Sequence, residues 1–251
     1  MERIVGMKTM AALLLALVIA VSAAIAAPPE YVAKKAGCEM IMDGVLDEPA
    51  WTNSQPVGPF VFAWYESGDK EQTEAKIVWD DTRIYFAFRC DDKHIWAEHY
   101  EHGSGVYQDD CCEAFISPVP EGPERLDYIN YEINCIASRL TGYHAPSRDV
   151  NKRWNECIGV EIGRVINGTC CDDSDTDTGW VLEFSIPFKH FEDFDAQFPP
   201  VNGQAIFLGL NRCGGKTNQQ YSQWSPSQTP KPNFHKPEDF GKVIFSTEVV
   251  R

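Results

Sequence analysis

The chain has 251 residues, of which 43% are hydrophobic, and a formal net charge of −15 at pH 7. This length is enough to bury one sizeable hydrophobic core. Such an acidic surface repels nucleic acid and anionic lipid, which argues against both as partners, whereas neutral ligands and calcium remain compatible with it.

The first segment has the three-part pattern of a secretory signal peptide. Arg3 and Lys8 precede the apolar run 10–21, and Ala24 and Ala26 follow in an A-x-A arrangement. The apolar run is shorter than the roughly 20 residues that span a bilayer, and no basic stop-transfer flank follows it. We therefore expect a signal peptide at 1–26, a single domain at 27–251, and a secreted, periplasmic or extracellular protein without membrane insertion.

Short β-rich runs bounded by Gly, Pro, Asp and Asn follow one another along the rest of the chain. Their spacing predicts an all-β protein built as an antiparallel β-sandwich. One helical turn is expected in "PFKHFEDF", which Pro187 opens. The predicted strands are 38–42, 59–65, 74–79, 83–90, 110–117, 127–137, 158–166, 179–186, 205–213, 219–224 and 242–246.

Alternation of apolar and polar residues predicts which side chains face the core. Trp51, Trp79 and Trp180 are also expected to be buried. The predicted inward residues are Ile84, Phe86, Phe88, Cys90, Cys112, Ala114, Ile116, Ile129, Tyr131, Ile133, Cys135, Ile206, Leu208 and Leu210. The predicted outward residues are Arg83, Tyr85, Arg89, Glu113, Tyr128, Asn130, Glu132, Asn134 and Asn211.

Nine cysteines in an exported chain favour disulfides over thiolate metal sites, and the odd number leaves at least one unpaired. No pair has CxxC spacing, so the zinc-ribbon and redox motifs lack their signature. Adjacent cysteines in a strand point to opposite faces, so each adjacent pair would serve two different partners or none. The cysteines are residues 38, 90, 111, 112, 135, 157, 170, 171 and 213.

Seven segments occur in the order and approximate spacing of a known family: "MIMDGVLDEPAW", "AKIVWDDTRIYFAFRCDD", "DDCCEAFISP", "YEINCIASR", "DTGWVLEFSIPF", "SQWSP" and "FHKPEDFG". In this respect the chain resembles the family 9 carbohydrate-binding modules of the DOMON-like group. The resemblance implies an immunoglobulin-like, jelly-roll-like β-sandwich. It also implies a binding site for the end of a sugar chain between two aromatic rings, structural calcium nearby and no organic cofactor.

The resemblance places the two rings at Tyr107 and Phe234, where the family usually has tryptophan. An aromatic ring offers area to the apolar faces of a pyranose. His235 would then lie near the ligand, and Trp154 is a candidate for an additional sugar contact. The alternatives are that Phe234 only anchors its loop and that His235 donates to a backbone carbonyl.

The resemblance places the polar rim of the site at Glu113, Asn134 and Asn211, and at Glu132, where some members have arginine. Carboxylates and amides satisfy sugar hydroxyls. For Glu113 and Asn134, a solvated sheet face or calcium coordination is the alternative.

Calcium candidates follow only loosely from the resemblance: Asp43 and Asp47 near the first predicted strand, and Asp91 or Asp92 after a hairpin. The acidic run "CDDSDTDTGW" departs from the spacing of an EF-hand loop, so we expect a solvated hairpin tip there.

Three functions compete at this stage. The expected one is a non-catalytic module that binds an oligo- or polysaccharide, alongside polysaccharide-degrading enzymes. Glu113 and Glu132 could instead form the acid and base pair of a glycosidase. A haem-binding DOMON-type domain would need axial ligands, for which Met40 and Met42 are the methionines beyond the leader.

Overall fold

The computed structural model describes residues 27–153 and 158–251, so the predicted leader lies outside the described residues. Within these ranges no helix is long and apolar enough to cross a bilayer. The strands are β1 (Glu30–Ala36), β2 (Thr73–Trp79), β3 (Arg83–Asp91), β4 (Cys111–Ser117), β5 (Tyr128–Asn134), β6 (Arg139–Ala145), β7 (Val150–Arg153), β8 (Glu161–Asn167), β9 (Gly179–Pro187), β10 (Ala205–Cys213), β11 (Tyr221–Gln223) and β12 (Gly241–Val250). The helical elements are α1 (Pro49–Thr52) and the 3-10 turns η1 (Val106–Gln108), η2 (Pro123–Leu126), η3 (Pro146–Arg148), η4 (Phe188–Phe191) and η5 (Pro237–Asp239).

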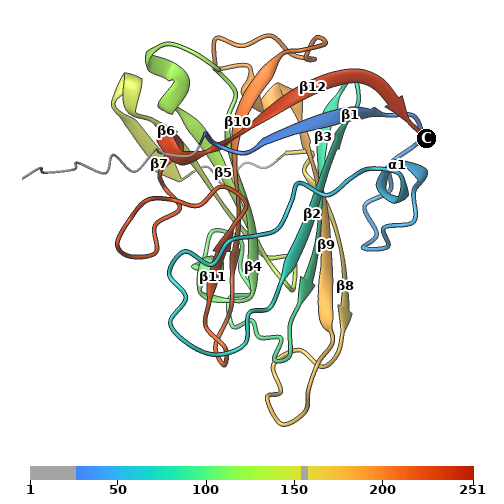
Figure 1. Cartoon of the computed structure of the whole chain (residues 1–251), viewed down its shortest axis with the longest axis vertical. Helices are drawn as coiled ribbons and strands as arrows, with labels where there is room; N and C mark the ends of the chain where they lie inside the picture. The colour runs from blue at the N-terminus through green and yellow to red at the C-terminus, as the bar shows by residue number, and fades with distance from the viewer. Residues whose placement is uncertain (1–26, 154–157) are drawn as a thin grey trace, which may run out of the picture.

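The strands form two layers joined along one edge (Figure 1). The hydrogen-bonded order is β7-β6-β5-β4-β10-β12-β1-β2-β3-β9-β8, with β11 on β10. Strand β1 pairs in parallel with both β12 and β2, and its register shifts between Lys34 and Lys35, where the strand passes from one layer to the other. The prediction of a β-sandwich is confirmed, but the expectation that all strands are antiparallel is wrong at β1.

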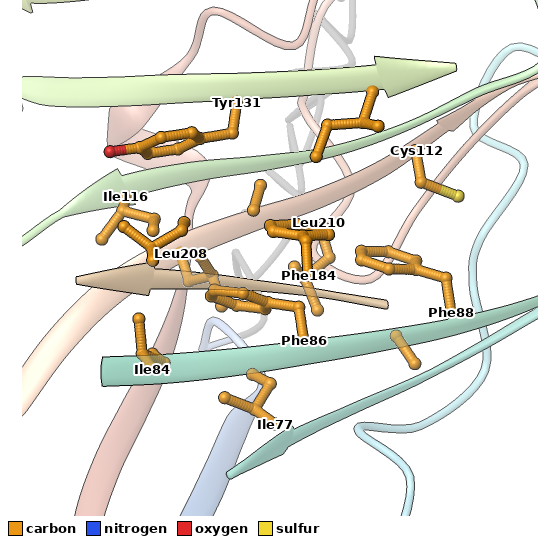
Figure 2. Packing of buried hydrophobic residues seen from close by; sticks show 14 of the residues in the cluster. Ile77, Ile84, Phe86, Phe88, Cys112, Ile116, Tyr131, Phe184, Leu208 and Leu210 are labelled. Carbon is orange, nitrogen blue, oxygen red and sulfur yellow. The ribbon is translucent and has the colours of Figure 1, made fainter. Parts of the chain in front are cut away.

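The interior lies between β2, β3 and β9 on one side and β4, β5 and β10 on the other (Figure 2). Every residue predicted to face inward belongs to this core, as do Trp79 and Trp180. Aromatic packing is close, with the rings of Phe86 and Phe184 stacked at a centroid distance of 5.1 Å. Burial of each large apolar side chain stabilises the fold by roughly 1.5–3 kcal/mol. The alternation in the sequence therefore gave the facing of these strands correctly.

The segment predicted as a strand at 38–42 is instead an irregular cover on the outer face of β2, β3 and β9. Glu183 on β9 holds it, because its Oε1 accepts the amide protons of Asp43 and Gly44 at 2.7 and 2.6 Å. The other oxygen of Glu183 accepts a hydrogen bond from Trp51 Nε1 at 3.0 Å. Trp51 is fully buried, as predicted. These side-chain hydrogen bonds replace those of a sheet ladder.

The remaining predicted elements differ in detail. The run 59–65 forms only one isolated bridge, from Val61 to Gln223. The hairpin between β2 and β3 is as predicted, and its turn is closed by Asp80, whose Oδ1 accepts the amide protons of Thr82 and Arg83 at 2.6 and 2.8 Å. The predicted helical turn is η4. Strands β1, β6 and β7 were not predicted.

The eight cysteines in the described ranges are free thiols, so the prediction of disulfides is wrong for them. Cys90 and Cys112 approach across the interior to an Sγ–Sγ distance of 3.4 Å, and Cys170 and Cys171 to 3.0 Å. The buried thiols pack as small apolar side chains, a role for which unpaired cysteine is suited. Cys157 lies outside the described residues.

Candidate functional site

A cavity of about 510 Å³ opens on the outer face of β4, β5 and β6, on the side away from the interior. Its volume lies within the range of small-molecule pockets. The 3-10 turn η1, strand β7 and the loop at 232–235 supply the other walls. Five of the eight residues predicted for ligand binding line this cavity, namely Tyr107, Glu113, Glu132, Phe234 and His235.

Two carboxylates form the polar floor of the cavity. Glu113 on β4 and Glu132 on β5 are directly opposite each other in the antiparallel pairing, so both project from the same sheet face. Asn211 Nδ2 donates to Glu113 Oε2 at 3.2 Å, and Cys213 Sγ donates to Glu113 Oε1 at 3.5 Å. Asn130 Nδ2 donates to Glu132 Oε1 at 2.7 Å. The floor is therefore positioned by neighbouring side chains on β5 and β10.

Burial raises the pKa of the Glu113 carboxyl to about 7, because the ionised form loses its hydration there, and the hydrogen bonds from Asn211 and Cys213 offset only part of this effect. Glu113 therefore changes its charge near neutral pH, where an exposed glutamate stays ionised.

Two histidines, His144 and His235, line the cavity, and both contact the ring of Tyr128, which does not itself line it. Tyr128 Oη and His235 Nδ1 are 2.8 Å apart, and the ring of His144 stacks on Tyr128 with a centroid distance of 4.6 Å. Because Asn130 donates through Nδ2 to Glu132, its Oδ1 is left to accept from His144 Nε2 at 2.8 Å, which assigns the proton of the neutral ring to Nε2. Burial lowers the pKa of His144 to about 4, so this ring is neutral at physiological pH.

The two predicted aromatic residues differ in exposure. Tyr107 is 46% exposed, whereas Phe234 is 8% exposed and packs against Trp64 and Tyr221 at centroid distances of 5.8 and 6.1 Å. Tyr107 thus offers an accessible ring, and Phe234 contributes the edge of a packed aromatic wall. The alternative that Phe234 anchors its loop is compatible with this packing.

Asn134 and Asn211 do not line the cavity, in contrast to their predicted place at its rim. Both are fully buried. Asn134 Nδ2 donates to His99 O at 2.9 Å and to Asp109 Oδ2 at 2.8 Å, which fixes the residue directly after η1 and therefore helps to position Tyr107. Asn211 acts through Glu113, as described above. Alternation predicted the sheet face of both residues correctly, but it could not predict the partners of their side-chain amides.

Several lining residues were missed because β6 and β7 were missed. Strand β6 contributes Leu140, Gly142 and His144, and β7 contributes Asn151 and Lys152. A Cβ at Gly142 would lie 2.4 Å from the side-chain oxygen of Asn130, so glycine permits the close approach of Asn130 to this strand. The run 139–145 does not separate into an apolar and a polar face, so the sequence carries no alternation signal for this strand.

The four predicted calcium ligands do not come together. Asp92 is buried, and its Oδ2 accepts hydrogen bonds from Arg212 Nη2 at 2.6 Å and from Trp180 Nε1 at 3.1 Å. The other three aspartates, Asp43, Asp47 and Asp91, are exposed. In the described ranges no three His, Cys, Asp or Glu side chains are arranged to hold a metal ion. The four aspartates thus do not fit one shared calcium site, and a calcium requirement stays a prediction. Trp154 lies outside the described residues.

Comparison with known proteins identifies relatives of this fold and sequence. A Bacteroides uniformis protein proposed to bind carbohydrate superimposes with a TM-score of 0.74 and 21% identity, over 88% of this chain and 100% of the other. A family 9 carbohydrate-binding module from Caldicellulosiruptor kristjanssonii superimposes with a TM-score of 0.60 in complex with cellotriose and 0.57 in complex with glucose. Both of these matches have 14% identity over 87% of this chain, and they cover 94% and 97% of the other chain.

Comparison with curated proteins finds none that matches this sequence. The model of the family described as carbohydrate-binding family 9 matches residues 43–245, which is most of the chain and includes every described residue that lines the cavity. The chain belongs to carbohydrate-binding family 9.

Proposed function

We propose that this chain is an exported, non-catalytic module that holds the end of an oligo- or polysaccharide in the cavity on β4, β5 and β6. The observation that carries the proposal is the convergence of an accessible ring, an aromatic wall and two carboxylates in one cavity. Ring faces match the apolar faces of a pyranose, and the carboxylates accept its hydroxyl protons. Export rests on the sequence pattern at 1–26.

In the proposed complex one sugar ring lies against Tyr107, with Phe234 and His235 on the other side. Glu113 and Glu132 then face the equatorial hydroxyls from the floor. Glucose and cellotriose, which the modules from Caldicellulosiruptor kristjanssonii bind, are the first ligands to test. A module of this kind serves polysaccharide-degrading enzymes by keeping them near their substrate.

A glycosidase is the second candidate, because Glu113 with its pKa raised to about 7 lies opposite Glu132 as an acid lies beside a base. Membership of carbohydrate-binding family 9 favours binding. Incubation with cello-oligosaccharides should release no reducing sugar from the wild-type protein, and release that Glu113→Gln abolishes would establish the enzyme instead.

Replacing Tyr107 with alanine should weaken sugar binding about five- to tenfold, because it removes the accessible stacking surface while leaving the core intact. Isothermal titration calorimetry with cellotriose measures the change, and circular dichroism checks the fold. Tyr100→Ala is the matched control, since Tyr100 lies seven residues earlier, is 68% exposed and does not line the cavity. If the two variants bind cellotriose with equal affinity, Tyr107 is not part of the binding site.

A further inference from the structure

A second cavity, of about 560 Å³, adjoins the first and shares Tyr221 and Pro232 with it. It lies outside the group of residues that the sequence predicted for binding. Aromatic rings and hydrogen-bonding groups both line it, a combination that also characterises the first cavity. These residues include Phe62, Trp64, Tyr65, Glu66, Gln219 and Thr229.

The rings of this second cavity are held in place by specific contacts. Trp64 Nε1 donates to the carbonyl oxygen of Thr229 at 2.7 Å, and the ring packs on Phe234 of the first cavity at 5.8 Å. Tyr65 Oη donates to the carbonyl oxygen of Gly68 at 2.7 Å, and Lys70 Nζ lies 4.4 Å from the centroid of its ring. Lys70 does not line the cavity, so this cation–π contact supports Tyr65 from outside it. An ordered ring loses little entropy when a ligand stacks on it.

The junction of the two cavities is also fixed. Tyr221 is the first residue of β11, and it pairs with Cys213 at the end of β10. Its ring meets Phe234 edge-on, at a centroid distance of 6.1 Å and an interplanar angle of 73°. Tyr221 and Pro232 thus form a boundary that the two cavities have in common.

We infer that the second cavity is a further subsite for the same glycan, and that it takes the sugar units next to the one held above Glu113 and Glu132. This inference rests on the proposed function and adds the residues that take the sugar units beyond the first one. Tyr65, 43% exposed, offers a stacking surface, and Glu66 and Gln219 offer a carboxylate and an amide for hydroxyl groups. Continuity with the first cavity distinguishes this surface from an isolated aromatic patch.

Calorimetric titration with glucose and with cellotetraose tests the subsite, because only the longer ligand can reach it. The wild-type protein should bind cellotetraose at least fivefold more tightly than glucose. Tyr65→Ala should weaken cellotetraose binding about fivefold and change glucose binding less than twofold. Tyr100→Ala removes an exposed ring that lines neither cavity, so this variant should bind cellotetraose as the wild type does.

The outcomes separate the subsite from the proposed function. Equal affinities of the wild type for glucose and cellotetraose, or an equal loss of both in Tyr65→Ala, would overturn the subsite. If Tyr107→Ala weakens both ligands while Tyr65→Ala weakens neither, the first cavity is the sugar site and the second is not part of it. If the wild type binds neither ligand, both the subsite and the proposed binding of glucose-type chains are wrong.

Discussion

Arg212→Met should lower the free energy of unfolding by about 3–5 kcal/mol, because it leaves two buried carboxylates without their cation. Arg212 is almost completely buried on β10, and its Nη2 and Nη1 donate to Asp92 Oδ2 at 2.6 Å and Asp110 Oδ1 at 2.9 Å. Its guanidinium also lies 5.1 Å from the ring centroid of Trp180. Chemical denaturation followed by tryptophan fluorescence measures the loss.

The matched control for this change is Arg89→Met, since Arg89 is an exposed arginine on β3. It should alter the stability by less than about 0.5 kcal/mol. Burial raises the pKa of Asp110 to about 7, so the deficit of Arg212→Met should also shrink as the pH falls through about 7, because protonation of Asp110 removes one of the unpaired charges. A deficit below 1 kcal/mol, or one that does not depend on pH, would contradict this account of the ion pairs.

Sugar affinity should rise about tenfold as the pH is raised from about 6 to about 8. Burial raises the pKa of Glu113 to about 7, so the carboxyl is protonated at the lower pH and ionised at the higher one. Hydrogen bonds to a charged acceptor are stronger than those to a neutral one, so sugar hydroxyls bind the ionised form better. Binding should thus release a proton near pH 7, which calorimetry in two buffers of different ionisation enthalpy detects.

The control for the pH effect is Glu113→Gln, which should bind with an affinity that is nearly constant over this range. Stability should change in the opposite direction. An acid whose pKa is raised in the folded state stabilises the fold while it keeps its proton, so the wild type should lose stability relative to Glu113→Gln as the pH rises from about 4.5 to 7. An affinity that falls with pH, or an unchanged slope in the variant, would exclude Glu113 as the titrating group.

The core could be predicted because alternation depends only on the residues within one strand. Leu208 and Leu210 face inward and Asn211 faces outward, because successive side chains of a strand point to opposite faces of the sheet. The same rule places Arg212 inward, where an arginine requires acidic partners. Those partners, Asp92 and Asp110, are 120 and 102 residues away in the sequence, so alternation could not name them.

The parts that were missed depend on long-range pairing. Strand β1 buries only the side chain of Ala33 completely, so the sequence of this strand shows little alternation of apolar and polar residues. Its parallel pairing is with β12, a strand from the other end of the chain. The cavity depends on which strands are neighbours. Asn134 was assigned to the correct face, but Asp109 occupies its amide. The raised pKa of Glu113 likewise follows from its burial, with β5 and β10 paired on either side of β4, and no local pattern in β4 reveals this burial.

A crystal structure of the protein with cellotriose bound tests the central claim most directly. The account predicts a sugar ring against Tyr107, with hydroxyl oxygens within about 3.2 Å of the carboxylate of Glu113 or Glu132. A sugar bound at another surface while this cavity holds only water would contradict it.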